Sequence, residues 1–209
     1  LANQGKGGAL TIGAGAAFSG KWLIPRIARF TSAHPDVLIN LATRDRPFDL
    51  EAESFDAAFH YGGNDWPGVV SVPLVGHENV VVCSPKYLQA SPRLRTARDL
   101  SNHTLLQHTR RPTRWRQWFQ AQGISDVDSW TGPRFEHFYM LTQAAIAHLG
   151  VALLPRFLVQ DDIDARRLVV ALKYEWVSDD GYCLVYSAGK KNDPRLEVFR
   201  RWLLEEVRG

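Results

Sequence analysis

An α/β fold with mainly parallel sheets is what this sequence predicts, from two observations. Short apolar or alternating runs, typical of strands, take turns with segments whose apolar residues recur every three or four positions, as in helices. The 209 residues, 45% of them hydrophobic and 22% charged, are enough for one or two compact lobes with a core. No run approaches the roughly 20 apolar residues of a membrane-spanning helix, so we expect no membrane contact.

The amino-terminal part contains a strand–helix–strand unit. Residues 1–7 are Gly-rich and polar, and we interpret them as a linker or an expression remnant. Strands are expected at 10–13 and 37–43, which a crossover helix can join as parallel neighbours. Pro35 ends this helix because the residue before a proline avoids the helical conformation. The apolar stripe of the helix is Leu23, Ile24, Ile27, Ala28 and Phe30.

Further strands and helices follow in the same alternation. The expected strands are 56–61, 69–74, 79–83, 104–107, 151–154, 168–171 and 182–187. The expected helices are 115–121, 138–148 and 194–207. The last of these is amphipathic, and its apolar residues should face the core.

The charge balance does not indicate nucleic-acid binding. With 25 basic and 22 acidic residues the net charge is only +3, and the signs are mixed. The most basic stretch contains Arg110, Arg111, Arg114 and Arg116. Its aromatic residues fall on one side of the expected helix 115–121 and are interpreted as core anchors, which places the arginines on a solvated face or at the rim of a cleft.

Each candidate catalytic or metal-binding motif in the sequence lacks a required residue. Gly15, Gly20 and Lys21 have the spacing of a phosphate-binding loop, but Trp22 stands where a magnesium-binding hydroxyl is needed. Ser19 lacks the flanking glycines of a nucleophile elbow. The seven histidines lack metal-ligand spacing. We therefore expect no catalytic residue, no metal and no cofactor, and hence no enzyme.

The loops after the first strands are the best candidates for a binding site. A helix that begins after the loop 14–18 presents backbone N–H groups and a partial positive charge, which suit an anion. In open α/β sheets ligands bind at the carboxyl ends of the strands. The loops 14–19, 44–49 and 61–66 are therefore expected to converge.

A series of short motifs, taken in order, resembles a single family and extends from Leu10 to Val207. The motifs are Trp22-Leu23-Ile24-Pro25-Arg26, His34-Pro35, Asp56-x-Ala58-x-His60-Tyr61-Gly62, Val82-Cys83-Ser84-Pro85-x-Tyr87-Leu88, Asp99-Leu100, Gly132-Pro133-Arg134-Phe135, Gln143-Ala144-Ala145, Gly150-Val151-Ala152-Leu153 and Phe199-Arg200-x-Trp202-Leu203. The chain resembles the effector-binding domain of LysR-type transcriptional regulators. The most similar branch is the one with the glycine-cleavage activator and the β-lactamase regulator.

The resemblance implies two Rossmann-like lobes of the type 2 periplasmic-binding-protein kind, joined by two crossover strands. Lobe I would comprise residues 8–81 and 184–209, and lobe II residues 82–183. A small-molecule effector would bind in the cleft between the lobes and control transcription. The regulator would be a cytoplasmic homodimer or tetramer. It would bind DNA only through an amino-terminal winged helix-turn-helix, which is absent from this chain.

The resemblance also suggests ligand-binding residues. Asp49 and Tyr182 match cleft residues of the β-lactamase regulator, whereas Ala17, His60 and Phe138 replace two hydroxyl residues and an arginine common in this branch. The full expected set is Ala17, Phe18, Ser19, Asp49, His60, Trp66, His137, Phe138 and Tyr182. These replacements predict a drier, more aromatic cleft, and hence a ligand less anionic than a simple carboxylic acid. In the alternative, Trp66 and Phe138 belong to the core, and the effector contacts only backbone.

Three alternatives stay open at the level of sequence. The same fold serves exported solute-binding proteins, although no export signal is visible at the amino end of this sequence. An α/β enzyme is the less favoured reading, since no nucleophile, base or metal cluster is evident. Cys83 and Cys183 fall near the implied crossovers, where they are either partners in a redox switch or small buried apolar residues.

Overall fold

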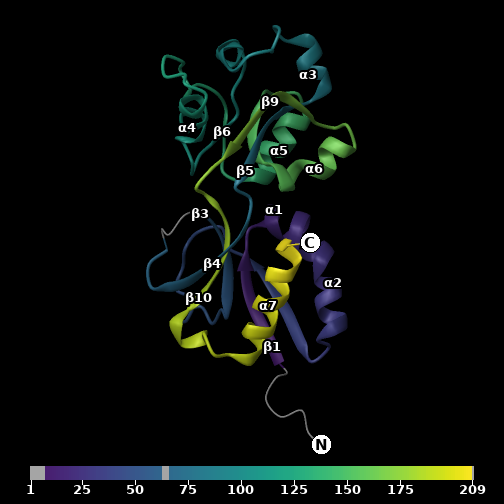
Figure 1. The fold of residues 1–209 in the computed structure, drawn as a ribbon, viewed down its shortest axis with the longest axis vertical. Helices are drawn as coiled ribbons and strands as arrows, with labels where there is room; N and C mark the ends of the chain where they lie inside the picture. The colour runs from purple at the N-terminus through teal and green to yellow at the C-terminus, as the bar shows by residue number, and fades with distance from the viewer. Residues whose placement is uncertain (1–7, 63–65, 209) are drawn as a thin grey trace, which may run out of the picture. The chain divides into compact units, whose positions relative to one another are not determined.

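The computed structural model describes residues 8–62 and 66–208, so the linker expected at 1–7 lies outside the described residues. The fold is mixed α/β and divides into two compact units (Figure 1). Unit 1 contains the described residues up to His77 and from Asp179 onward, and unit 2 is Glu78–Ser178. The chain therefore passes from one unit to the other twice.

Unit 1 is built on a five-stranded sheet of order β2-β1-β3-β10-β4. The strands are β1 (Gly8–Ala14), β2 (Val37–Thr43), β3 (Ala57–Gly62), β4 (Val69–Val75) and β10 (Gly181–Ser187). The helical segments are α1 (Ala16–Phe18), a π-type segment η1 (Ser19–Leu23), α2 (Ile24–Ala33), a 3-10 turn η3 (Ala188–Lys190) and α7 (Pro194–Arg208). Strand β1 is parallel to β2 and β3, whereas β10 is antiparallel to β3 and β4.

The two faces of this sheet are covered differently. Helices α2 and α7 lie on one face (Figure 1), where the ring of Phe30 is 5.2 Å from that of Phe199, which in turn is 6.4 Å from Phe59 on β3. On the other face, loop residues such as Phe48 and Trp66 pack against a cluster that includes Ala58 and is otherwise formed by Leu50, Phe55, Cys183 and Val185. Alternate residues of β3 thus face opposite layers.

Unit 2 contains a three-stranded antiparallel sheet and a two-stranded parallel one. The first has the order β8-β5-β9, formed by β5 (Glu78–Cys83), β8 (Ala152–Pro155) and β9 (Val169–Val177). The second consists of β6 (Gln107–His108) and β7 (Arg134–Phe135). The helices are α3 (Pro85–Ala90), a 3-10 turn η2 (Ala97–Asn102), α4 (Arg114–Ala121), α5 (Phe138–Ile146) and α6 (Arg156–Asp164).

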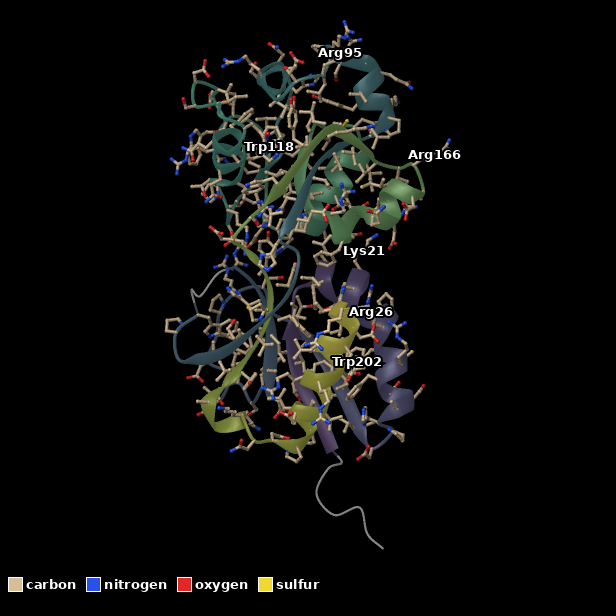
Figure 2. All side chains as sticks on the ribbon, viewed as in Figure 1. Lys21, Arg26, Arg95, Trp118, Arg166 and Trp202 are labelled. Atoms are coloured by element: carbon tan, nitrogen blue, oxygen red, sulfur yellow. The ribbon has the colours of Figure 1, made fainter. Side chains whose placement is uncertain are left out.

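Strand β5 divides the core of unit 2. Val81 and Cys83 pack in one buried cluster with Trp115 and Trp118 of α4, as expected for core anchors. Helices α5 and α6 contact β5 and β8 from the other side (Figure 1). Trp118 lies inside the unit, whereas Arg95 and Arg166 extend outward from it (Figure 2).

The structure corrects two expectations and adds a helix. The sheets are not mainly parallel, since the strands that follow the two crossings, β5 and β10, are antiparallel to both of their neighbours. The same pairing assigns whole strands to one unit, so the unit boundaries lie after residues 77 and 178 rather than after 81 and 183. The strand expected at 79–83 ends at Cys83 as expected, but the sequence analysis listed no helix after it. Helix α3 follows because the Ser84 hydroxyl accepts a hydrogen bond from the Tyr87 amide at 3.1 Å and caps the helix.

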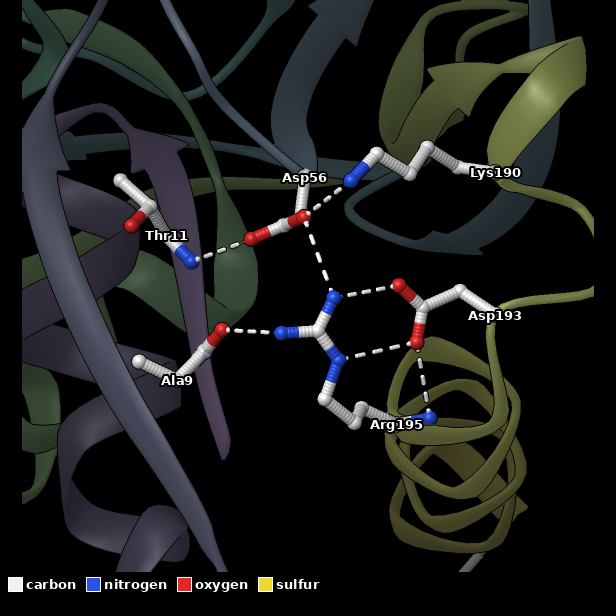
Figure 3. A network of polar contacts seen from close by, with 6 residues as sticks. All are labelled: Ala9, Thr11, Asp56, Lys190, Asp193 and Arg195. Atoms are coloured by element: carbon white, nitrogen blue, oxygen red, sulfur yellow. Dashed lines mark hydrogen bonds and ion pairs between the residues drawn. The ribbon is translucent and has the colours of Figure 1, made fainter. Parts of the chain in front are cut away.

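A network of polar contacts joins β1 to the start of β3 and to the carboxyl-terminal segment (Figure 3). The Asp56 carboxylate accepts a hydrogen bond from the Thr11 amide at 2.9 Å and forms an ion pair with Lys190 at 2.7 Å. Arg195 lies 3.7 Å from the same carboxylate and donates to the Ala9 carbonyl at 2.7 Å. Because Asp56 is nearly buried, these contacts stabilise the sheet at the end opposite the loops 14–19 and 44–49.

None of the helices formed by the described residues has the length and apolar character needed to span a bilayer.

Candidate functional site

The loops that follow β1, β2 and β3 lie together, as predicted. The Arg44 amide donates to the Ala14 carbonyl at 3.2 Å, which joins the first loop to the second. Gly15 lies so close to Asp45 that a Cβ atom there would be 2.5 Å from a carboxylate oxygen. The rings of Phe48 and Trp66 are 5.4 Å apart and join the second loop to the third.

Phe18 and Tyr182 form an aromatic group on the helix-covered face of the unit 1 sheet. Their rings stack with centroids 4.4 Å apart, and Phe18 also contacts Phe59 at 4.6 Å and Trp22 at 5.2 Å. Tyr182 lies opposite Tyr61 in the ladder between β10 and β3, with ring centroids 4.9 Å apart. Phe18 is fully buried and Tyr182 is 6% exposed, so the phenyl ring of Phe18 belongs to the core of unit 1.

Ala17 and Ser19 flank Phe18 in the first turns of continuous helical backbone that runs from Ala16 to Ala33. Both are partly exposed, and the Ser19 amide donates to the Gly15 carbonyl at 3.0 Å. Gly15, the residue that precedes the helix, provides no side-chain cap. The small side chains at 17 and 19 therefore leave the start of this helix accessible.

His60 and Trp66 lie on the other face of the same sheet. His60 is paired with Cys183 in the ladder between β3 and β10, one position away from the pair Tyr61 and Tyr182. Successive residues of a strand point to opposite faces. The ring of His60 contacts Trp66 at 5.4 Å, and Trp66 packs on the loop-side core. The expected residues of unit 1 therefore form two groups, one on each face, and not a single aromatic pocket.

The Asp49 carboxylate has a local structural role. Its Oδ1 atom accepts hydrogen bonds from the amides of Glu51 at 3.0 Å and Ala52 at 2.9 Å. An aspartate whose side chain caps the following backbone in this way stabilises a turn. Asp49 thus shapes the segment that connects β2 to β3, beside the three converging loops.

In unit 2, Phe138 lies in a cationic environment. It is the first residue of α5 and is 5% exposed, and His137 precedes it at the cap position. The centre of the Arg114 guanidinium lies 5.5 Å from the centroid of the Phe138 ring, that of Arg111 lies 5.9 Å from it, and the His108 ring is 4.8 Å away. His137 itself lies 4.0 Å from Glu136.

Arg114 departs from the expectation of a solvated face or a rim, since it is only 4% exposed. It precedes Trp118 by four residues in α4, and residues four apart share one face of a helix. The four-residue spacing between Arg114 and Trp118 therefore indicated that Arg114 is buried. Arg116 is exposed as expected.

The environment of His108 is reflected in its pKa. Burial, the largest cause, and the neighbouring basic side chains, of which Arg111 acts most strongly, lower the pKa of His108 to about 3. His108 is therefore neutral at pH 7. Its Nδ1 atom accepts a hydrogen bond from the Arg110 amide at 3.3 Å, which places the ring proton on Nε2.

Within the described ranges, no group of three or more His, Cys, Asp or Glu side chains is arranged to hold a metal ion. Cys83 and Cys183 are both buried, and neither is in a disulfide. Burial raises the pKa of the Cys83 thiol to about 11. Since the thiolate is the reactive form, Cys83 is chemically unreactive at neutral pH.

Comparisons with known proteins define the class. The family model described as the LysR substrate binding domain matches residues 3–208. The chain therefore belongs to the LysR substrate-binding domain family, and its two-unit α/β fold is the periplasmic-binding-protein-like fold of that family.

Individual relatives are transcription regulators. The glycine cleavage system transcriptional activator of Escherichia coli K12 is 34% identical over 200 residues, which are 96% of this chain and 65% of that protein. The HTH-type transcriptional activator AmpR of Citrobacter koseri is 32% identical over 196 residues, 94% of this chain and 66% of the relative. The chain thus spans about two thirds of the length of these relatives. The resemblance drawn from the sequence motifs is confirmed.

A solved structure agrees with this assignment. The X-ray structure of the effector domain of the transcriptional regulator AmpR of Pseudomonas aeruginosa superposes with a TM-score of 0.84 at 30% sequence identity. The match covers 96% of both chains. The described residues therefore have the fold of a LysR effector domain.

Proposed function

We propose that this chain is the part of a LysR-type transcriptional regulator that binds a small-molecule effector, and that it has no catalytic activity. The observation that carries the proposal is the match to the LysR substrate-binding domain over residues 3–208. It is supported by relatives that are named as transcription regulators. Such a regulator acts on DNA in the cytoplasm, through a helix-turn-helix outside this chain, as a homodimer or tetramer.

The proposed mechanism is a shift between conformations. The two units are joined by only two chain passages, at 77–78 and 178–179. A ligand favours whichever conformation of the chain it binds better. The regulator then transmits this preference to the DNA-binding part.

The proposed effector contacts are given for each unit by itself. In unit 1 we assign them to Ala17, Ser19 and Tyr182 at the start of the first helix, with Phe18 as the supporting ring. His60, Trp66 and Asp49 contribute from the loop-covered face. In unit 2 the contacts come from His137 and Phe138. The support for this assignment is the convergence of the three loops and the partial exposure of Ala17, Ser19 and Trp66.

DNA binding by the parent protein tests the proposal. Electrophoretic mobility of DNA from the region upstream of the parent gene is measured with the parent protein and, as a control, with the 209-residue chain alone. We expect the parent protein to retard this DNA and the isolated chain to leave it unchanged. An export signal encoded ahead of Leu1, with no DNA retention by the mature parent, would contradict the proposal and favour a solute-binding protein.

A further inference from the structure

Unit 1 contains an open hollow that none of the proposed effector contacts lines. Its volume is about 450 Å³, which lies in the range of small-molecule sites. The lining residues come from the segment between β2 and β3, and from the end of β10 with the turn η3. Among them are Leu50, Glu51, Ser54, Phe55, Ser187 and Gly189. Ser187 is at the other end of β10 from Tyr182, so the hollow is separate from that effector contact.

The segment before β3 gives the hollow an apolar wall and a polar rim. Leu50 and Phe55 are 4% and 7% exposed and belong to the core cluster on the loop-covered face. The Phe55 amide donates to the Leu50 carbonyl at 2.7 Å, and the Ser54 amide donates to the Glu51 carbonyl at 3.1 Å. Glu51 and Ser54 are exposed. These backbone hydrogen bonds hold the two polar side chains beside the apolar wall.

Glu51 determines the charge of the hollow. The ammonium of Lys190, which also lines it, lies 2.7 Å from the Asp56 carboxylate. Arg195 lies between Asp56 and Asp193, so that two basic and two acidic side chains balance one another (Figure 3). Among the described residues, no basic side chain lies within ion-pair distance of the Glu51 carboxylate. The hollow therefore favours a positively charged ligand.

Gly189 leaves space between two oxygen atoms of the hollow. A Cβ atom at this position would lie 3.8 Å from Glu51 Oε1 and 3.9 Å from Ser187 Oγ. The Ser187 hydroxyl is buried and has no hydrogen-bond partner in the part of the chain that the structure describes. A serine reorients its hydroxyl by rotation among the staggered χ1 positions. A hydrogen-bond donor beside Gly189 would therefore meet both the Glu51 carboxylate and the Ser187 hydroxyl.

From this geometry we propose that the hollow binds a small organic ammonium ion. Its N–H groups donate to the Glu51 carboxylate and the Ser187 hydroxyl, since an ammonium has three donors and no acceptor. Its apolar part contacts Leu50, Phe55 and the methylene stem of Lys190.

A metal ion fits the hollow less well than an organic cation. Calcium takes six to eight oxygen ligands, whereas no group of three or more potential metal-binding side chains occurs within the described ranges. The apolar wall also offers a metal ion nothing. This site goes beyond the proposed regulatory function and does not depend on it.

Nuclear magnetic resonance titration of the 209-residue chain tests the inference. The probes are butylamine and phenethylamine, both protonated at pH 7, with 1-butanol and 2-phenylethanol as uncharged counterparts and butanoate and 3-phenylpropanoate as anionic ones. We expect an amine at millimolar concentration to shift the amide signals of residues 50–55 and 187–190 saturably, with its alcohol about threefold or more weaker. No shift of these signals by either amine, equal or tighter binding of an alcohol, or preference for an anion would overturn the inference.

Two variants assign the binding to the hollow. Glu51→Gln removes the charge at an exposed position and keeps the shape of the side chain. Gly189→Ala places a methyl group between the two oxygens at ordinary contact distances, so the fold should tolerate it. We expect each to weaken amine binding by about threefold to tenfold.

Each variant has a matched control in unit 1. Glu205→Gln makes the same charge change at an exposed position of α7. Gly20→Ala adds a methyl group that meets nothing within 4 Å. Both controls should bind the amine as the natural sequence does.

The outcomes decide the assignment. If Glu51→Gln and Gly189→Ala, both folded by circular dichroism, bind the amine as tightly as the natural sequence, the assignment is wrong. An equal loss of affinity in Glu205→Gln would show that overall charge attracts the amine, and would also overturn it. The regulatory function is unaffected by any of these results, because retardation of DNA by the parent protein tests it separately.

Discussion

Whether a side chain in this protein is buried, and which face it occupies, depends more on helix and strand periodicity than on residue type. Phe18, expected to touch the ligand, is fully buried in a stack with Tyr182, because it lies on the helix side that faces the sheet. Arg114, expected near solvent, is buried because it shares a helix face with Trp118. The sequence supplied the candidate rings but not their grouping, since His60 and Tyr61 point to opposite faces of one strand.

Acid should destabilise the protein through His108. Its pKa is about 3 in the folded chain, against about 6.5 in an unfolded one. Between these values the unfolded state binds a proton that the folded state does not, so the free energy of unfolding falls as the pH is lowered. The loss from this group is about 2 kcal/mol between pH 7 and pH 5. Urea unfolding at both pH values should show a smaller pH dependence in His108→Asn, and equal dependence in both proteins would disprove the assignment.

The Cys83 thiol should be inert in the folded protein. Its pKa of about 11 leaves very little thiolate at neutral pH. We expect a thiol reagent at pH 7 to modify Cys83 only after denaturant is added, and mild peroxide to leave the number of free thiols unchanged. Mass spectrometry of the labelled chain checks both. Rapid labelling of Cys83 without denaturant, or a disulfide after peroxide, would instead support a redox role.

The bounds of helices and strands were predictable where the apolar pattern extended over many residues. Prediction failed where a helix cap or pairing with a distant strand determined the structure. Helix α7 and strands β2 and β10 lie close to their expected bounds because their apolar patterns are clear. The expected strand at 104–107 is reduced to a bridge between Leu105 and Val151 and the short β6, since its partners lie far along the chain. The direction of β5 and β10 depends on such distant pairing, which no local pattern encodes.

Gly150 should be essential to the packing of that bridge. A Cβ atom there would overlap the Thr104 carbonyl oxygen, which accepts the Val151 amide at 2.9 Å. Gly150→Ala should therefore lower the free energy of unfolding by about 1–3 kcal/mol. Gly20→Ala serves as the control, because a Cβ at this exposed helical position meets nothing within 4 Å and should stabilise the helix by about 0.5–1 kcal/mol. Urea unfolding that ranked the two variants in the opposite order would contradict this account.

The Asp56 network should contribute more to stability than an exposed ion pair does. Asp56→Asn removes the charge that Lys190 and Arg195 face, at a side chain only 12% exposed. We expect a loss of about 1–3 kcal/mol in the free energy of unfolding, since removal of one partner leaves the others with an incomplete network. In the control, Asp126→Asn breaks a pair with Arg98 in which both side chains are more than 60% exposed, and should leave the thermal midpoint unchanged. Equal effects of the two variants would show that burial is not the deciding factor.

At the scale of the whole molecule, the two-unit fold follows from how the chain is distributed between two cores. Strand β5 pairs only with strands of unit 2, and β10 pairs only with strands of unit 1. No described sheet is therefore shared between the units. The family resemblance predicted this division, whereas periodicity alone gave only one or two lobes. The fold consists of two separate cores that the chain connects at two places. A ligand can shift the conformational equilibrium of such a protein.

Energy transfer between one dye on each unit tests whether an effector changes the conformation of the chain. Glu205→Cys in unit 1 and Gln89→Cys in unit 2 place labels at exposed helical positions, while both natural cysteines are buried. The doubly labelled chain is diluted into unlabelled protein to remove transfer between copies. We predict a saturable change in transfer efficiency with a small molecule that calorimetry shows to bind the chain. Unchanged efficiency at saturating ligand would contradict it.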